Sequence, residues 1–139
     1  MGLLADFFVA TRSDATWYAS SEESRDKFEG VEYKNYLPLS ISELWAVLDG
    51  ERLDPDRHDL EAIFIDDDGG SWLFRFPDEL CNKISKINHS QIGKLAAEWS
   101  ESDEVPGDAQ DNEPLLRDLI KLCDLAAYKD RSVFLWGSL

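Results

Sequence analysis

The side chains of this chain that could bind a metal or exchange protons are a histidine with acidic neighbours and the carboxylates of several acidic runs. His58 lies in the segment ERLDPDRHDL, where Asp54, Asp56 and Asp59 are its acidic neighbours. Imidazole and carboxylate groups bind metals or exchange protons only when they converge in space. The simpler interpretation of this spacing is a solvated loop. The alternative is a small enzyme or metal-binding protein that uses His58 and nearby carboxylates.

A second acidic run, DDDGG at residues 66–70, is superficially like a calcium loop. The EF-hand order and its closing glutamate are absent, so a polar turn is the better interpretation. The sequence contains no glycine-rich phosphate loop, nucleophile elbow or HExxH motif, and Cys81 and Cys123 lack CxxC or zinc spacing. The sequence therefore predicts no metal and no cofactor, favours a non-catalytic protein, and predicts two free, buried thiols.

The strongly negative charge limits the class of partner. The chain has 29 acidic and 14 basic residues, a net charge of −15. Nucleic acid and anionic lipid carry the same sign, so we expect neither as a partner. Residues 98–113 contain seven acids and no base. Such a surface either keeps the protein soluble or meets a basic protein, and the residues that we expect to contact a basic partner are Glu101, Asp103, Glu104, Asp67 and Asp68.

The start of the sequence and its apolar runs predict neither a signal peptide nor a membrane span. The start, MGLLADFF, has neither the basic region nor the long apolar stretch of a signal peptide. No apolar run approaches the roughly 18–20 residues of a membrane span. We therefore expect a small, acidic, cytoplasmic protein. Its most plausible function is non-catalytic protein binding, with an immunity or inhibitor protein as one form, and the sequence does not predict its oligomeric state.

The elements that must position these residues are strands at both ends of the chain, a hairpin between them, and helices. Residues 61–77 place an Asp-Gly step between two apolar runs, which predicts a hairpin that turns at Asp68 and Gly69. Residues 7–11 and 133–136 are almost wholly apolar, which indicates strands inside a sheet. We expect one α+β domain over residues 1–139, with a mixed or antiparallel sheet, a central hairpin and about four packed helices.

Two local signals predict where helices begin. Ser40 and Glu43 have the spacing of a capping box, and Gly50 is a natural end for the helix that would follow, with Trp45 on its apolar face. Pro114 suits a first helical turn and predicts the start of a leucine-rich last helix. The acidic residues before Pro114 then form a surface loop of roughly a dozen residues.

Several segments follow one another in a familiar order. They are an N-terminal strand with MGLLADFFVAT, a tryptophan-bearing helix closed by glycine (LSISELWAVLDGE), a strand that runs into an FPDEL helix, and a leucine-rich helix before a VFLW strand. In this order of elements the chain resembles the YfbM-like family of small bacterial proteins. That family has no established activity, so the resemblance implies a bacterial α+β protein and assigns no site residue.

Overall fold

Five strands form one sheet in the computed structural model, which describes residues 3–20, 28–66, 68 and 70–138. The strands are β1 (Leu4–Ala10), β2 (Gly30–Lys34), β3 (Glu61–Asp66), β4 (Ser71–Arg75) and β5 (Ser132–Ser138). They lie in the order β2-β1-β5-β4-β3, and each neighbouring pair is antiparallel. The expected α+β class with an antiparallel sheet is confirmed.

The two terminal strands lie inside the sheet, as their apolar sequences predict. β5 is central, between β1 and β4, and its residues 133–137 are buried. The predicted hairpin of β3 and β4 is present, but it lies at one edge of the sheet, with β3 outermost, and not at the centre as predicted. The strands that are apolar on both faces occupy the centre instead. Asp67 and Gly69 lie outside the described residues, so the expected turn at Asp68 and Gly69 stays a prediction.

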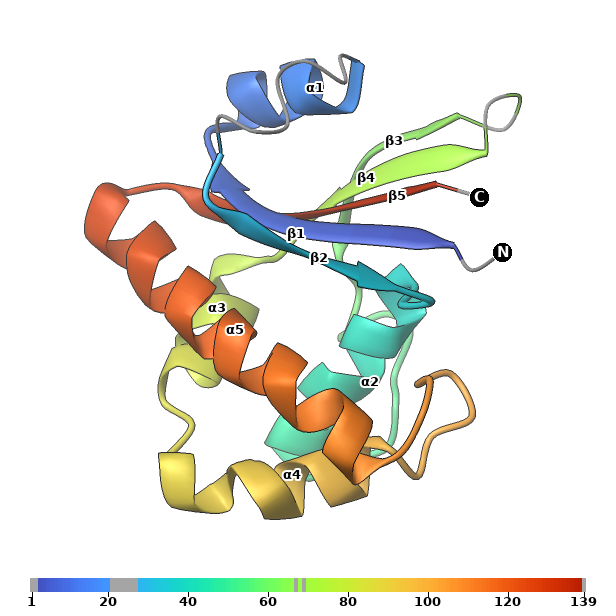
Figure 1. The fold of residues 1–139 in the computed structure, drawn as a ribbon, viewed down its shortest axis with the longest axis vertical. Coiled ribbons are helices and arrows are strands. Elements are labelled where there is room, and N and C mark those ends of the chain that lie inside the picture. The colour runs from blue at the N-terminus through green and yellow to red at the C-terminus, as the bar shows by residue number, and fades with distance from the viewer. Residues whose placement is uncertain (1–2, 21–27, 67, 69, 139) are drawn as a thin grey trace.

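Helices cover both faces of the sheet unequally (Figure 1). They are α1 (Arg12–Ser20), α2 (Pro38–Asp49), α3 (Asp78–Ser85), the short 3-10 helix η2 (His89–Gln91), α4 (Ile92–Trp99) and α5 (Ala109–Lys129). Figure 1 shows α1 on one side and α2 to α5 on the other. The larger core, which includes Phe7, Leu135 and Trp99, lies under α2 to α5, and a smaller one, which includes Phe8 and Phe134, lies on the α1 side. None of the described helices is both long and apolar enough to cross a membrane.

Both predicted helix starts are wrong by several residues. α2 begins at Pro38 after Leu37, so Ser40 is the third helical residue and not the cap. α5 begins at Ala109 because the Asp108 carboxylate accepts from the Asp111 N–H at 3.1 Å, and the Asp111 carboxylate accepts from the Asp108 N–H at 3.0 Å. This reciprocal cap outweighs the signal of Pro114, which lies inside the helix. The acidic loop is therefore shorter than predicted, at residues 100–108.

Candidate functional site

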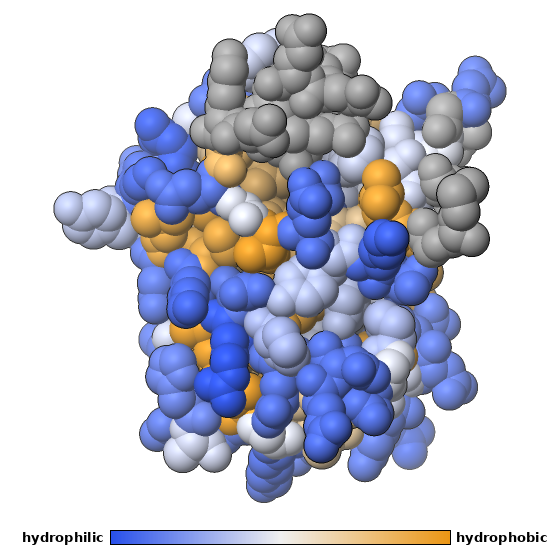
Figure 2. Space-filling view, in the orientation of Figure 1, coloured by the Kyte–Doolittle hydropathy of each residue, from blue (hydrophilic) through white to orange (hydrophobic). Residues whose placement is uncertain are grey.

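The exposed acids Glu101, Asp103 and Glu104 lie in the loop of residues 100–108, which joins α4 to α5. In the described part of the chain, none of the three forms an ion pair. Figure 2 shows hydrophilic residues over most of the lower part of the molecule, where α4 and this loop lie. We call residues 100–108 the acidic loop. The carboxylates of Glu101, Asp103 and Glu104 are exposed, and no ion pair compensates them among the residues that the structure describes.

Asn112, which is fully buried on the first turns of α5, ties together the two ends of the acidic loop. Its side-chain nitrogen donates to Ser100 Oγ at 2.8 Å, and to the carbonyl oxygens of Pro106 and Asp108, each at 2.9 Å. Its side-chain oxygen accepts a hydrogen bond from the Tyr36 hydroxyl. Both N–H donors of this buried amide are therefore directed at the acidic loop, where three acceptors share them, and its oxygen accepts from Tyr36.

The hydrogen bond from Tyr36 to the Asn112 side-chain oxygen requires a protonated Tyr36 hydroxyl, because the hydroxyl must donate. Burial, with a smaller contribution from the nearby Asp111 carboxylate, raises the pKa of Tyr36 to about 12. The hydroxyl therefore keeps its proton at physiological pH. The Tyr36 ring also stacks on Trp99, with 5.9 Å between ring centroids and 22° between planes.

Ser40 joins the acidic loop to the start of α2. Its hydroxyl donates to the Glu104 carbonyl at 2.6 Å and accepts from the Leu37 N–H at 2.9 Å. The Trp99 indole N–H donates to the Ser40 carbonyl at 2.8 Å, and Val105 buries its side chain in the larger core. Together with Asn112, these contacts fix an irregular loop from α2, α4 and α5, and we call them the brace.

The remaining residues expected to contact a partner lie elsewhere. Asp68 is exposed in the turn between β3 and β4, and Asp67 lies outside the described residues. Figure 1 shows the ends of β3 and β4 that flank this turn far from the acidic loop. Asp68 therefore does not form one patch with Glu101, Asp103 and Glu104. Glu101, Asp103 and Glu104 do lie together on one loop.

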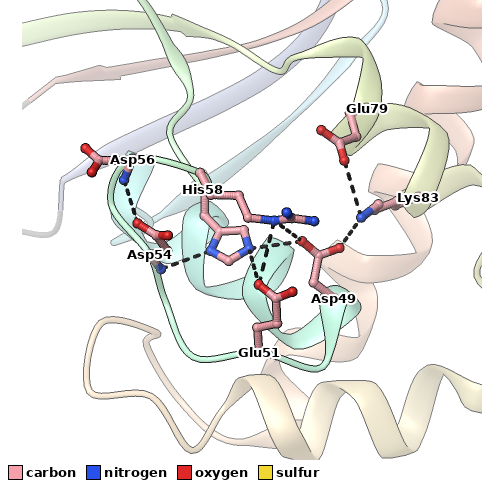
Figure 3. Close-up of polar contacts among 8 residues, drawn as sticks. Asp49, Glu51, Asp54, Asp56, His58, Glu79 and Lys83 are labelled. Carbon is pink, nitrogen blue, oxygen red and sulfur yellow. Dashed lines mark hydrogen bonds and ion pairs between the residues drawn. The ribbon is translucent and has the colours of Figure 1, made fainter.

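The histidine named from the sequence is buried, with a side chain that is 0% exposed. Figure 3 shows it against Asp49, at the end of α2, and Glu51. His58 Nε2 lies 3.0 Å from Asp49 Oδ2 and 3.9 Å from Glu51 Oε2, and potential ligand atoms of the three residues lie within 4.8 Å of one another. Asp54 contributes its backbone N–H to the imidazole rather than its carboxylate.

Both ring nitrogens of His58 are engaged, which defines its tautomer. Nδ1 accepts from the Asp54 N–H at 3.0 Å, so the proton is on Nε2 and is donated to Asp49. A metal bound at Nε2 would move this proton to Nδ1, where it would oppose the Asp54 N–H. The negative charge of Asp49 is also compensated by ion pairs with Lys83 and with Arg57. The Arg57 Nε lies 3.3 Å from Asp49 Oδ2. This geometry favours a latch that holds the loop after α2 against α3.

We predict that metal ions do not stabilise this latch or the DDDGG turn. A ligand at ~100 times its Kd adds about 2.7 kcal/mol to the free energy of unfolding, which thermal unfolding would detect. We expect EDTA, calcium and zinc to leave the melting temperature unchanged. A calcium-induced rise that Asp66→Ala abolishes, or a zinc-induced rise that His58→Gln abolishes, would contradict this prediction.

The latch should make stability depend on acid pH. Burial opposes the charge on Asp49, but hydrogen bonds from Lys83, His58 and Arg57 outweigh it and hold the pKa of Asp49 below 3.8. The stabilisation from a lowered carboxylate pKa is complete above the unfolded value and is lost as pH falls through the folded value. It is therefore present at neutral pH, begins to be lost as pH falls towards 3.8, and is gone only below the lower pKa of the folded state.

Asp49→Asn should accordingly lower the free energy of unfolding at neutral pH by about 2 kcal/mol, the usual magnitude for hydrogen bonds to a charged group. Urea titrations at a series of pH values measure the difference from the wild type, which should shrink as pH falls below 3.8. Asp56→Asn, at an exposed neighbouring carboxylate, is the control. A difference that stays constant with pH would rule out the latch as its source.

The fold and the site define a single-domain α+β protein with an exposed acidic loop held by a buried brace. No protein-family model and no curated protein matches the chain. Among solved structures, the chain is similar to the crystal structure of YfbM from Escherichia coli, a protein of unknown function, with 12% identity and a TM-score of 0.45 over 98% of this chain and 99% of that chain. The resemblance to YfbM-like proteins that the order of segments in the sequence indicated therefore reappears in this match. A likeness at this level says nothing about activity or partners.

Proposed function

We propose that this chain is an acidic, cytoplasmic, non-catalytic binding protein that presents Glu101, Asp103 and Glu104 to a basic protein partner. The observation that carries the proposal is the brace. Hydrogen bonds from the buried residues Asn112 and Ser40 hold a loop whose exposed acids Glu101, Asp103 and Glu104 form no ion pair among the described residues. An immunity or inhibitor protein that neutralises a basic partner is one form of this function.

A braced loop suits binding because its backbone is already ordered. Association ordinarily loses about 0.5–1.5 kcal/mol for each flexible side chain that is immobilised, and loop ordering adds to this loss. A loop fixed before encounter avoids the backbone part of that loss. Charges of one sign at fixed positions also steer an oppositely charged protein and favour one orientation of approach.

Capture of partners from a native lysate tests the proposal when two variants of equal charge are compared. The first variant removes the loop charges with Glu101→Gln, Asp103→Asn and Glu104→Gln. The matched control removes three exposed charges elsewhere: Glu32→Gln, Asp56→Asn and Asp124→Asn. Each variant removes three negative charges from −15, which leaves −12.

We expect the wild type and the control to retain a basic protein that the loop variant loses. Circular dichroism and urea unfolding should be unchanged in both variants, because the brace uses Ser40, Asn112 and backbone groups rather than these carboxylates. Equal loss of the partner from both variants would assign binding to total charge. Retention by both variants would exclude the acidic loop as the binding surface.

A further inference from the structure

Two cysteines, predicted as separate buried thiols, face each other across the contact between α3 and α5. The Cys81 and Cys123 thiols are both free, and both line one surface cavity. Cys123 is 1% exposed, whereas Cys81 is only partly buried. The prediction of a free, buried thiol is therefore confirmed for Cys123, whereas Cys81 is free but only partly buried.

A surface cavity of about 250 Å³ opens at this pair. Its lining includes both thiols together with Asp78, Asn82 and Arg131. A water molecule occupies about 30 Å³ of liquid, so the cavity has room for a small hydroperoxide and its leaving group. The polar lining supplies hydrogen-bond donors, and the opening gives solvent access to a thiol pair that packing would otherwise enclose.

The two thiols have unequal environments. A hydrogen bond from Cys123 and, more weakly, one from the Val133 backbone N–H lower the pKa of Cys81 below its usual value, against the effect of burial. The same hydrogen bond, together with burial, raises the pKa of Cys123. Cys81, which is also the more exposed of the two, therefore has the greater thiolate character.

We propose that Cys81 and Cys123 form a peroxide-reactive site, in which Cys81 attacks a hydroperoxide and Cys123 converts the product into a disulfide between α3 and α5. The proposal rests on the placement of both thiols in the lining of one cavity and on their unequal exposure. The site uses thiols of α3 and α5 and none of the carboxylates of the acidic loop. The proposal is therefore independent of the proposed binding function.

The reaction balances in two steps. The Cys81 thiol first releases its proton to water, and the resulting thiolate attacks one peroxide oxygen. An S–O bond forms and the O–O bond breaks. The other oxygen leaves and is protonated to an alcohol or water. Sulfur is oxidised by two electrons to sulfenic acid while the peroxide is reduced. The Cys123 sulfur then attacks the Cys81 sulfur; the S–S bond forms, the S–O bond breaks, and the leaving hydroxide takes the Cys123 proton as water.

The test treats the intact protein with hydrogen peroxide and follows it by mass spectrometry. The wild type should become lighter by two hydrogen atoms, with one internal disulfide that links Cys81 to Cys123 and that dithiothreitol reverses. Cys123→Ser should stop at a Cys81 sulfenic acid, heavier by one oxygen, which dimedone traps. Cys81→Ser should leave Cys123 reduced under the same conditions.

A measurement on the wild type alone keeps the proposal testable if a serine variant fails to fold. Iodoacetamide should alkylate native Cys123 at least about tenfold more slowly than Cys81, and the two rates should converge in urea. Faster labelling of Cys123, disulfides only between molecules, or no oxidation by excess peroxide would each overturn the proposal.

Discussion

Asn112→Ala is expected to destabilise the folded protein by about 3–5 kcal/mol, because it combines lost hydrogen bonds with a new cavity. The side chain is fully buried and bonds to Ser100, Pro106, Asp108 and Tyr36. Its removal leaves buried donors and acceptors without partners, and each such group costs about 1–3 kcal/mol. The free energy of unfolding in urea measures this loss.

Hydrogen exchange then shows whether the loss is local to the acidic loop. In the variant, amides of residues 100–108 should exchange faster relative to global unfolding, since Asn112 joins both ends of that segment. Gln110→Ala, at an exposed position on the same helix, should change stability by less than about 0.5 kcal/mol. A near-neutral Asn112→Ala would show that the brace does not hold the loop.

Trp45→Ala is expected to have a similar effect, a loss of about 3–5 kcal/mol, through a different mechanism. The side chain is 3% exposed in the larger core, and its ring meets the His58 imidazole edge-on at 5.6 Å between centroids. Truncation therefore opens a cavity under α2 and removes the support on one side of the latch.

Trp45→Phe is the matched variant for this position. The Trp45 N–H has no hydrogen-bond partner among the described residues, so phenylalanine loses no such bond and keeps an aromatic ring near His58. It should cost clearly less than alanine in urea unfolding. Equal losses for the two variants would mean that ring packing is not what Trp45 contributes, and a neutral Trp45→Ala would place α2 outside the core.

Much of the fold was predictable because it depends on local patterns. The apolar runs at both ends indicated strands inside the sheet, and β1 and β5 lie there. Helix starts were less predictable, because several residues near each start have suitable chemistry. Ser40 and Pro114 are both good local signals, but Pro38 and the Asp108–Asp111 pair begin the helices earlier.

The brace could not be derived from the sequence, because its contacts join distant segments. Tyr36 lies 76 residues from Asn112, and Ser40 lies 64 residues from Glu104. One signal was present: Asn112 shares a helix face with Leu115 and Leu119, and an amide on an apolar stripe implies a buried partner. In the same way, the acidic residue against His58 is Asp49, from the end of α2, rather than the nearer aspartates.

The association rate with a captured basic partner, measured at low and high salt, tests the central claim most directly. Charges are screened beyond about 10 Å at 0.1 M salt and about 3 Å at 1 M, so steering by the acidic loop should weaken as salt rises. The wild type and the Glu32, Asp56 and Asp124 control should bind quickly and slow markedly with salt. The Glu101, Asp103 and Glu104 variant should bind more slowly at low salt and show a shallower salt dependence, with the dissociation rate changed much less. An association rate that ignores both salt and the loop substitutions would contradict the account.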